Sequence, residues 1–503
     1  MEIKTLVQPI ESAKGDLLVV NEFEGVTKPG GATGAVDKAL DGLLSKTMQE
    51  RKFTGKVGET LMVQTMGMIP AKRVVLIGLG PKASFSLEVV RSVSGIAVRE
   101  ARRVYAKKIV SILHGAGNGG LNPRDCARAL TEGMLLASYT FLKYKKDGAK
   151  KAQEQEIKEV VIPQLDRKSL KAIEQGILEG RLEAEATIIA RDLVNEPPSN
   201  MAPRHLVEVA KGIAKKNRGV RIKVYGKLEL ERMGAGGLLG MARGSDEEPF
   251  LVHLIWKPAK AKKSVAICGK GITFDSGGIS IKPGEHMYTM KLDMAGAAAV
   301  LGVFSKIREL NPQVEVHGIF GACENMPSGK AIKPGDIVST MSGKTIEVLH
   351  TDAEGRVILS DVLEYAQKQK PDYLIDLATL TGACMVALGE EVAGIMGNDN
   401  KLIERIKNAA DESGERIWEL PLVPEYADQM KSDVADIRNI TGTRYGGAIM
   451  GGMFLQEFVN KGQPWAHLDI AGPAFAERHT FSYVPKGGTG FGVRTLIHFL
   501  KRM

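Results

Sequence analysis

The stretch SVAICGKGITFDSGG, residues 264–278, determines how the rest of the chain is interpreted. Its first five residues, Ser264–Cys268, form a short apolar run that is typical of a buried strand. In open α/β sheets, ligands bind outside the carboxyl ends of the strands. We therefore expect Lys270 and Asp275 to lie just beyond a strand end, where the following glycine pair lets the backbone approach a ligand. A glycine-rich turn with a solvated Asp and Lys is the alternative interpretation.

Three further acids follow downstream. Asp293 precedes the small-residue run 295–300, which predicts a helix, and Asp352 and Glu354 lie between the predicted strand Thr345–Leu349 and another predicted helix. Side chains two residues apart on an extended segment point the same way, so Asp352 and Glu354 are expected to face one centre. Taken singly, helix capping is the likelier explanation for Asp352 and Glu354 and the alternative for Asp293, because carboxylates stabilise helix N-termini.

Four carboxylates near apolar segments cannot share one pocket unpaired, because like charges repel in a poorly hydrated space. A pair of divalent cations about 3.5–4 Å apart resolves the repulsion, activates a water molecule and holds a carbonyl or phosphoryl group. Lys282 and Arg356 add positive charge nearby, and Arg356 follows the expected start of a helix, which suits a developing negative charge. The leading hypothesis is a two-metal hydrolase.

The composition sets broad limits on the class of protein. A chain of 503 residues is too long for one ordinary core, so two domains are expected. Hydrophobic residues make up 44% and charged residues 25%, as in a soluble globular protein. The aromatic fraction of 5% argues against stacking platforms for single-stranded nucleic acid. A formal charge of +9 permits nucleic-acid contact without requiring it.

The cysteines and the apolar runs indicate a compartment. The four cysteines lie far apart and form no CxxC pair, so neither a disulfide framework nor a thiolate zinc site is expected. The first residues lack the apolar core of a signal peptide, and no uncharged apolar run approaches the roughly 20 residues that span a bilayer. We expect a cytoplasmic protein with no membrane association.

Alternating strand and helix patterns organise the chain. The lysine-rich segment 142–155 predicts a domain edge, and apolar residues at helical spacing predict a long helix over 167–193. That helix ends before Asn195-Glu196-Pro197-Pro198, a strong stop signal. We therefore divide the chain into an N-terminal domain (1–165), a linker helix (166–194) and a C-terminal catalytic domain (195–503). The fold class is α/β, with two domains that each have a central sheet flanked by helices.

The expected elements of the two domains are as follows. In the first domain, strands are predicted at Leu17–Val20, Val74–Leu79 and Ile109–His114, and a helix at Leu87–Ala106. In the second domain, strands are predicted at Ser264–Cys268, Val314–Ala322, Thr345–Leu349, Tyr373–Leu377 and Ala466–Ile470. Helices are predicted there at Ala295–Leu310, Arg356–Gln369, Lys401–Ser413 and Val493–Arg502. Such alternation indicates a mixed or mostly parallel sheet.

Two other glycine-containing strings are weaker signals. Gly78–Ala83 fits a relaxed dinucleotide-binding pattern, but no second strand ends in an acid about 20 residues later. Gly343-Lys344-Thr345 lacks the earlier glycine of a P-loop, because Val338 occupies that position. The nine histidines offer no HExxH spacing, so a histidine-based zinc site is not expected.

Four strings, taken together and in this order, resemble the cytosolic leucyl aminopeptidase family, known in bacteria as aminopeptidase A. They are GKGITFDSGG (269–278), MKLDM (290–294), KPGD (333–336) and TDAEGR (351–356), of which the last is highly specific. The resemblance extends to NEPP (195–198), TLTGA (379–383) and DIAG (469–472), so it covers the whole second domain. The first domain matches mainly in length and in its alternating pattern.

The resemblance implies two divalent cations per subunit, Mn²⁺ or Zn²⁺, held by five residues. One cation would be bound by Lys270, Asp275, Asp293 and Glu354, and the other by Asp275, Asp352 and Glu354. Lys270 ligates only as a neutral amine, so the adjacent metal must strongly depress its pKa. The bridging water would then act as a hydroxide-like nucleophile near neutral pH.

The resemblance also implies two catalytic side chains and a substrate pocket. Lys282 would stabilise the oxyanion of the tetrahedral intermediate, and Arg356 would hold a bicarbonate ion that relays the proton. The pocket for the first side chain of a peptide would be formed by Met290, Thr379, Gly382 and Ala471, which favours leucine and methionine. The family has Asn before the TDAEGR string, where this chain has His350, and we expect catalysis to survive that change.

The family resemblance further implies a homohexamer that acts on peptides. Two other functions are considered beside this one. Some bacterial relatives bind DNA, and here a basic group could contact phosphates, namely Arg99, Arg102, Arg103, Lys107, Lys108 and the lysines after Phe141. A two-metal phosphoesterase would need the same acids but no pocket for a free amine.

Overall fold

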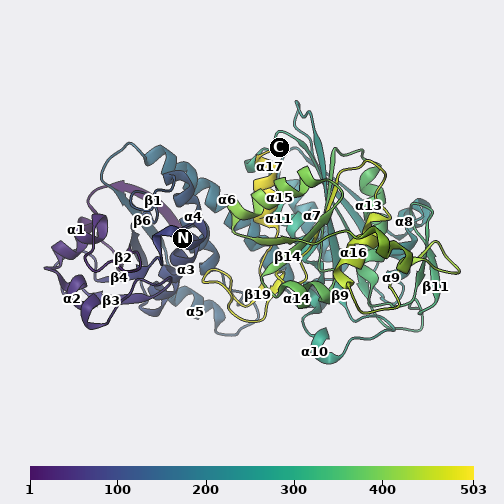
Figure 1. The fold of residues 1–503 in the computed structure, drawn as a ribbon, viewed down its shortest axis with the longest axis horizontal. Helices are drawn as coiled ribbons and strands as arrows, with labels where there is room; N and C mark the ends of the chain where they lie inside the picture. The colour runs from purple at the N-terminus through teal and green to yellow at the C-terminus, as the bar shows by residue number, and fades with distance from the viewer. The chain divides into compact units, whose positions relative to one another are not determined.

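Two central sheets, one of six strands and one of eight, organise the chain (Figure 1). The computed structural model describes residues 1–503, which form two units. The first unit contains residues 1–185 and 478–485, and the second contains residues 186–477 and 486–503. Helix α6 (Leu170–Asn195) begins in the first unit and ends in the second. The expected fold class, two α/β domains joined by a long helix, is confirmed.

The sheet of the first unit is parallel except at one edge. Its strand order is β1-β6-β5-β2-β4-β3, and only β3 runs antiparallel to its neighbour. The strands are β1 (Glu2–Val7), β2 (Leu17–Glu22), β3 (Thr60–Gln64), β4 (Arg73–Gly78), β5 (Lys108–Ser111) and β6 (Glu159–Gln164). Parallel strands with both faces covered read as continuous apolar runs, which is why β2 and β4 were recognisable.

Helices cover both faces of this sheet. Apolar side chains of α1 (Gly31–Ala39) and α2 (Leu43–Glu50) pack with Leu18, Val20 and neighbouring residues on one face. Side chains of α3 (Leu87–Arg103), α4 (Pro123–Ser138) and the start of α6 pack with Leu17 and Val19 on the other. Alternate residues of β2 therefore serve opposite cores, as the two-residue period of a strand requires.

The sheet of the second unit is mixed, and its four central strands are parallel. The strand order is β15-β14-β17-β13-β9-β10-β8-β7, with β17, β13, β9 and β10 parallel to one another. The strands are β7 (Val220–Tyr225), β8 (Phe250–Trp256), β9 (Ser264–Asp275), β10 (Glu315–Asn325), β13 (Tyr373–Ala378), β14 (Val392–Gly397), β15 (Arg416–Glu419) and β17 (Trp465–Asp469). All four central strands end at the same edge.

Helices also flank the second sheet. A large apolar cluster joins one face to α9 (Gly236–Ala242), α13 (Glu354–Gln367) and α16 (Gly447–Gln456). Helix α11 (Ala295–Ser305) packs on β9, β10 and β13, beside α7 (Pro203–Lys216) and α17 (Val493–Lys501). A hairpin of β11 (Asp336–Ser339) and β12 (Thr345–Val348) leads toward α13. None of the helices combines the length and apolar character needed to cross a bilayer.

One expectation about the second sheet was wrong. Strand β9 does not stop at Cys268 but continues to Asp275, so Lys270 lies within the strand and Asp275 is its last residue. The extension is stabilised because β10 pairs with β9 along almost its whole length, up to the pair formed by Asn325 and Asp275. Glycines at 269 and 271 suggested a turn, but ladder hydrogen bonds and burial outweigh a weak local propensity.

Candidate metal centre

The candidate site lies at the carboxyl ends of the four central strands of the second unit. Strand β9 ends at Asp275, β10 ends at Asn325, Thr379 follows β13, and β17 ends at Asp469. Because parallel strands end at one edge, a polar residue at each end is delivered to the same place. Asp293 comes from a 3-10 helix, Met290–Met294, directly before α11.

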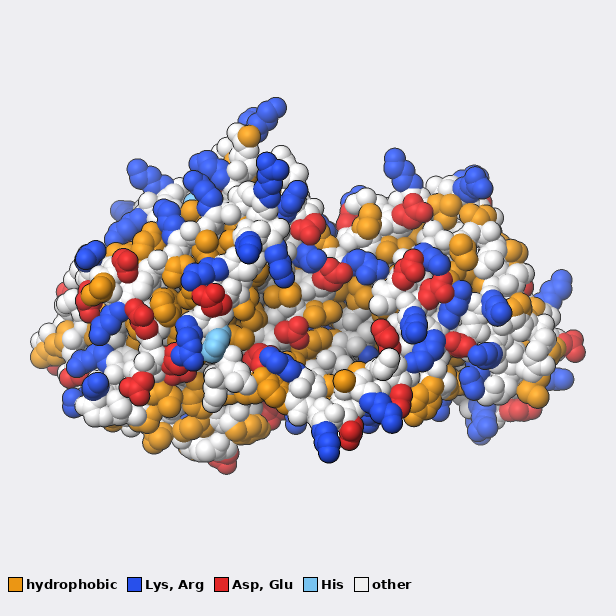
Figure 2. Space-filling model, turned by 180° about the vertical axis from the view of Figure 1, so that it is seen from behind, with side chains coloured by type: hydrophobic (Ala, Val, Ile, Leu, Met, Phe, Trp, Pro, Cys, Tyr) orange, Lys and Arg blue, Asp and Glu red, His pale blue; other side chains and the backbone are white.

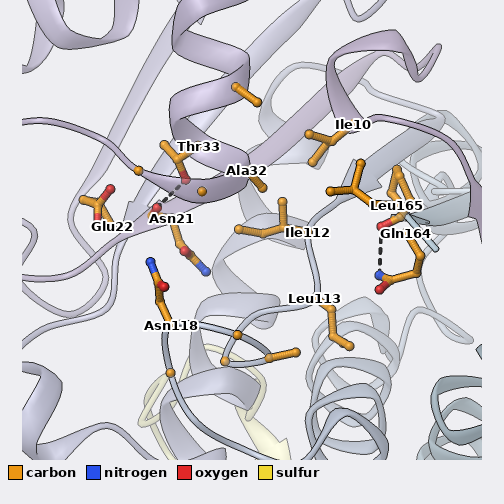
Figure 3. A pocket seen from close by; sticks show the side chains of 18 of the residues that line it. Ile10, Asn21, Glu22, Ala32, Thr33, Ile112, Leu113, Asn118, Gln164 and Leu165 are labelled. Atoms are coloured by element: carbon orange, nitrogen blue, oxygen red, sulfur yellow. Dashed lines mark hydrogen bonds between the residues drawn. The ribbon is translucent and has the colours of Figure 1, made fainter. Parts of the chain in front are cut away.

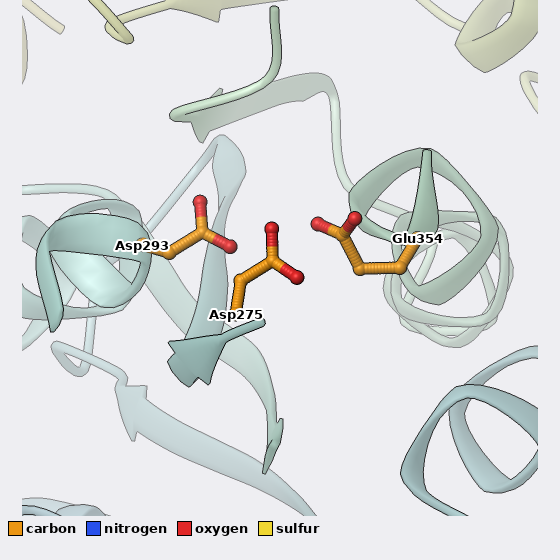
Figure 4. A group of neighbouring side chains, drawn as sticks. All are labelled: Asp275, Asp293 and Glu354. Atoms are coloured by element: carbon orange, nitrogen blue, oxygen red, sulfur yellow. The ribbon is translucent and has the colours of Figure 1, made fainter. Parts of the chain in front are cut away.

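Three carboxylates converge at this edge (Figure 4). Ligand atoms of Asp275, Asp293 and Glu354 all lie within 4.8 Å of one another. Asp275 lies between the other two carboxylates, and each of the three side chains belongs to a residue that is only 2% exposed. Buried carboxylates brought this close need positive charge to offset their repulsion.

Two lysines supply part of that positive charge. The Lys270 Nζ atom lies 2.7 Å from Asp293 Oδ1 and 2.9 Å from Glu354 Oε1, and it donates to the Thr379 carbonyl oxygen at 2.9 Å. A Cβ atom at Gly355 would lie 2.6 Å from the Lys270 side chain, so this glycine leaves room for the lysine.

The second lysine reaches the remaining acid. Lys282 Nζ lies 2.8 Å from Asp275 Oδ2 and also pairs with Asp352. The ion pairs form two groups, one around Lys270 and one around Lys282, and the proximity of Asp275 to Asp293 and Glu354 brings the two groups together. Asp352 enters this network through Lys282 rather than through the three converging carboxylates.

Burial and mutual repulsion shift the pKa values of these groups. Burial raises the pKa of Asp293 to about 7, with Lys270 acting against the shift and Glu354 adding to it. Burial, followed by Glu354 and Asp293, raises the pKa of Asp275 well above its usual value. Burial alone would lower the pKa of Lys270, but the surrounding carboxylates outweigh it and the pKa is raised. Lys270 therefore needs added positive charge before it can act as a neutral ligand.

The donor set fits hard divalent cations. Asp293 Oδ2 and Glu354 Oε2 are buried side-chain oxygens with no hydrogen-bond partner, which is rare and costly in a folded protein. When all four carboxylates are ionised, as metal ligands are, they exceed the two lysines by two negative charges, so the network is not neutral on its own. Buried oxygens with free lone pairs and excess negative charge are what such cations require.

The expected conformation of the TDAEGR segment was wrong. Asp352 lies in a turn and Glu354 is the first residue of α13, so the two are not alternate residues of an extended segment. His350 stabilises this turn, because its Nδ1 accepts a hydrogen bond from the Asp352 backbone N–H at 3.2 Å. A turn and a helix start, not strand alternation, direct these acids to the centre.

Arg356 occupies a different environment from the acids. Its Nη1 donates to the Asn439 carbonyl oxygen at 3.0 Å, and its guanidinium lies 5.9 Å from the centre of the Phe454 ring. Burial lowers its pKa, although Glu354 and then Asp469 act in the opposite direction. The structure places Arg356 one turn into α13, without a direct hydrogen bond or ion pair to the carboxylates.

The four predicted substrate-binding residues lie around the same edge. Thr379 contacts the acids directly, because its Oγ1 donates to Asp293 Oδ1 at 2.7 Å. Met290 begins the short helix that carries Asp293. Gly382 is the first residue of α14 (Gly382–Leu388), and a Cβ there would meet no atom within 4 Å. Ala471 donates its backbone N–H to Asp469 Oδ1 at 3.2 Å.

Two buried positioning residues were not identified from the sequence. Asn325 Nδ2 donates to Asp275 Oδ1 at 2.8 Å and to the Thr351 carbonyl oxygen at 3.0 Å, so it links β9 to the TDAEGR turn. Asp469 accepts hydrogen bonds from Leu380, Thr381 and Ala471, which ties two loops of the predicted pocket together. Their signal in the sequence is a polar residue at the end of an apolar strand, the same signal that marked Asp275.

Four of the basic residues considered for DNA contact are engaged within the first unit. Arg102 donates to carbonyl oxygens of Ala137 and Ser138, and Arg103 pairs with Glu100. Lys107 donates to carbonyl oxygens at 153 and 154, and Lys108 pairs with Glu159. On the face shown in Figure 2, Lys and Arg side chains are interspersed with Asp and Glu. These contacts do not favour DNA binding as the main function.

The fold and the acid cluster define a class, the metal-dependent hydrolases. The chain belongs to the cytosol aminopeptidase family: the model of the family's catalytic domain matches residues 188–497, and that of its N-terminal domain matches residues 19–148. Members of this family are metal-dependent exopeptidases, and the resemblance drawn from the sequence is confirmed.

Relatives and solved structures agree with this assignment. A probable cytosol aminopeptidase of Alkaliphilus oremlandii is 42% identical over 504 residues, covering 100% of both chains. The structure of a tomato leucine aminopeptidase mutant is similar with a TM-score of 0.89 and 35% identity, covering 100% of this chain and 97% of that one. The bottromycin maturation enzyme BotP in complex with Mn gives a TM-score of 0.85 and 34% identity, covering 97% and 99%.

Proposed function

We propose that this chain releases N-terminal amino acids from peptides, with leucine and methionine preferred, and that it uses two divalent cations to do so. One observation carries the proposal: Asp275, Asp293 and Glu354 converge within 4.8 Å, and two of their buried oxygens lack hydrogen-bond partners. Such a site is costly unless it binds cations.

The proposed ligands follow the sequence resemblance. One cation would be held by Lys270, Asp275, Asp293 and Glu354, and the second by Asp275, Asp352 and Glu354. When bound, the cations lower the pKa of a water molecule, so that it becomes a nucleophile near neutral pH. We propose Mn²⁺ or Zn²⁺, and the Mn complex of BotP supports the first of these.

Lys282 and Arg356 are proposed as the catalytic side chains. Carboxylates around Lys282 outweigh its burial and raise its pKa, so it carries a positive charge that suits an oxyanion. Arg356 makes a hydrogen bond through Nη1, and its remaining donors suit a bicarbonate ion that accepts and returns a proton.

Met290, Thr379, Gly382 and Ala471 are proposed to select the first side chain of the peptide. The open space around Gly382 and the small side chain of Ala471 leave room for an unbranched or γ-branched apolar side chain. Asp469 would keep the loops that carry Thr379 and Ala471 in a fixed relation.

Organisation and location are further parts of the proposal. We propose that residues 195–503 form the catalytic domain, with residues 166–194 as a linker helix and residues 1–165 as the N-terminal domain. We also propose a homohexamer, as the sequence resemblance implies, and a cytoplasmic location, in keeping with the names of the relatives. Light scattering after size-exclusion chromatography measures the molar mass of the assembly directly. The mass of a monomer would contradict the proposed homohexamer.

Hydrolysis of leucine p-nitroanilide tests the function. We expect activity that a chelator abolishes and that Mn²⁺ or Zn²⁺ restores, together with little activity on p-nitrophenyl phosphate. Asp352→Ala should lose the activity, because it removes a proposed ligand. Full activity of that variant, or hydrolysis of the phosphate ester alone, would overturn the proposal.

A further inference from the structure

We propose that Asn439 is a positioning residue of the metal centre, which fixes the turn formed by residues 349–353 and the side chain of Arg356 relative to one another. Asn439 belongs to none of the sequence motifs that marked the site. The inference rests on the proposed function, in which Asp352 and Glu354 are metal ligands and Arg356 is catalytic. It adds a residue that acts on these three groups through their neighbours rather than by binding a cation itself.

The backbone places Asn439 beside the turn. Strand β16 (Ile437–Arg438) pairs in parallel with β12, whose last residue, Val348, directly precedes the turn. Asn439 follows β16, and its backbone N–H donates to the Glu347 carbonyl oxygen at 3.0 Å. Because strand pairing determines where Asn439 lies, a change of its side chain leaves this placement in force.

The side chain of Asn439 directs all of its hydrogen bonds at the turn. Its Oδ1 accepts from the backbone N–H groups of Leu349 at 2.9 Å and His350 at 3.4 Å. Its Nδ2 donates to the carbonyl oxygens of His350 at 2.8 Å and Ala353 at 3.3 Å. An amide offers two donors and two acceptor positions, so all four are used, and the residue is completely buried. A side chain without both donor and acceptor ends cannot replace these bonds.

The backbone carbonyl of Asn439 makes a further contact with the proposed catalytic machinery. It accepts a hydrogen bond from Arg356 Nη1 at 3.0 Å. Arg356 lies in the first turn of α13, the helix that begins with Glu354. One residue therefore bonds to the turn before Glu354 through its side chain and to the arginine after Glu354 through its backbone.

A second set of bonds holds only the middle of the turn. The Thr351 N–H donates to Ser280 Oγ at 3.2 Å, and the Thr351 carbonyl oxygen accepts from Asn325 Nδ2 at 3.0 Å. Asn439 instead bonds to both ends of the turn, at residues 349–350 and at residue 353. Without its side chain the turn stays anchored at Thr351 but loses both end contacts, so the separation of the two acids that flank residue 353 is less closely fixed.

The decisive variant is Asn439→Ala, which removes all four side-chain hydrogen bonds and keeps the backbone bonds. Asn217→Ala is the matched control, because Asn217 is also a buried asparagine of the second unit but bonds to Ile213 and Ser305. Asn439→Ser is a milder variant for the case that Asn439→Ala does not fold. Its short hydroxyl cannot reach both ends of the turn, so the same effects are expected at a smaller size.

Hydrogen exchange of the full chain without metal, followed by mass spectrometry, reports on the turn directly. We expect exchange in the segment 345–356 to be about tenfold or more faster in Asn439→Ala, because the N–H groups of Leu349 and His350 lose their acceptor. Exchange in this segment should not change in Asn217→Ala.

Metal binding and activity then test the positioning role. Equilibrium dialysis should show Mn²⁺ binding weakened by about 10–100-fold in Asn439→Ala, the range for residues that orient metal ligands. We expect kcat/KM on leucine p-nitroanilide to fall by a similar factor. Asn217→Ala should bind Mn²⁺ and hydrolyse the substrate like the original chain.

Three results would overturn the inference. Unchanged exchange in the segment 345–356 would show that Asn439 does not hold the turn. Faster exchange with unchanged Mn²⁺ binding would show that the turn does not orient the ligands. Equal losses in Asn217→Ala, with an equal fall in thermal midpoint, would assign the effect to general destabilisation. Failure of the proposed function is a different result, because the original chain itself would then neither bind Mn²⁺ nor hydrolyse leucine p-nitroanilide.

Discussion

The carboxyl edges of the two central sheets carry different residues and therefore offer different chemistry. In the second unit, the strands end in buried Asp and Asn side chains, and lysines partly neutralise the acids. In the first unit, the same kind of edge opens on a cavity of about 730 Å³ bordered by glycines and an uncapped helix, with no Lys or Arg in its lining (Figure 3). The comparison shows that the fold supplies the location, whereas the residues at the strand ends decide the chemistry that is possible there.

The largest expected effect on activity comes from removing one acid at the carboxyl edge of the sheet in the second unit. Glu354→Gln keeps the size of the side chain but removes the negative charge, so we expect kcat/KM on leucine p-nitroanilide to fall by more than about 100-fold, beyond the range of residues that only support a ligand. Equilibrium dialysis should show a parallel loss of Mn²⁺ binding. Glu364→Gln, on the same helix, is the control, and an equal loss there would break the comparison.

Asn325 tests whether the strand ends act through their hydrogen bonds. Asn325→Ala removes the donor shared by Asp275 Oδ1 and the Thr351 carbonyl oxygen, so we expect kcat/KM to fall by about 10–100-fold. Asn217→Ala is the control, because Asn217 is a buried asparagine that bonds to Ile213 and Ser305 instead. A similar fall in both variants, matched by equal loss of stability, would show that Asn325 is merely structural.

A buried carboxyl outside the acid cluster makes the second unit less stable as pH rises. Burial raises the pKa of Asp361 to about 7, against an ordinary value of 3.8. Between pH values equal to these two pKa values, the folded chain binds more protons than the unfolded chain. The free energy of unfolding therefore falls as the pH rises, by about 1.4 kcal/mol per pKa unit and up to a few kcal/mol in all. Urea unfolding of the chain and of Asp361→Asn, at pH values across this window, should give a difference in free energy of unfolding that changes with pH. A difference that stays constant would contradict the prediction.

A buried histidine in the first unit has the opposite effect: it makes the chain less stable as the pH falls. Burial lowers the pKa of His114 to about 4, against an ordinary value of 6.5, and its Nδ1 lies 2.7 Å from Asn21 Nδ2. Between these values the unfolded chain binds more protons, so acidification through this window lowers the free energy of unfolding. In His114→Gln this acid-dependent loss should be smaller in the same urea experiment. An identical pH profile in both proteins would rule out a neutral buried imidazole.

The smallest effect is expected at His350, where the sequence resemblance leads one to expect Asn. Its Nδ1 accepts from the Asp352 N–H, a bond that an Asn carbonyl oxygen two residues earlier also makes in a turn. His350→Asn should therefore change kcat/KM by much less than about 100-fold. His350→Ala, which removes the acceptor, should cost more than His350→Asn, and the reverse order would contradict this role.

Much of the fold was predictable because buried strands and amphipathic helices have clear periods. Strands β2 and β4 and helices α3, α6 and α15 (Asn400–Ser413) all overlap the segments expected from the sequence. The extent of β9 was not predictable, because its glycines disfavour a strand locally and only pairing with β10 and β13 stabilises it. Strands β7 and β8 were missed although their sequences, VRIKVY and FLVHLIW, are typical of strands.

The candidate site was predictable only in part. The acids were found because a motif places them in a fixed order, and the structure brings Asp275, Asp293 and Glu354 together. Asn325 and Asp469 were missed because their partners are set by strand register, which the sequence does not display. The cavity of the first unit was missed because the glycines that border it carry no side-chain signal.

The short segment 478–485 has a consequence for how the protein is made. Although it comes near the end of the chain, it belongs to the first unit, where Tyr483 donates to Glu88 and Ser482 donates to the Ser92 carbonyl oxygen. A nascent chain therefore cannot finish its first unit until the ribosome has translated almost every codon. Fragments that end at residue 185 leave the contact sites of Ser482 and Tyr483 bare, and early termination of translation should yield aggregation-prone products.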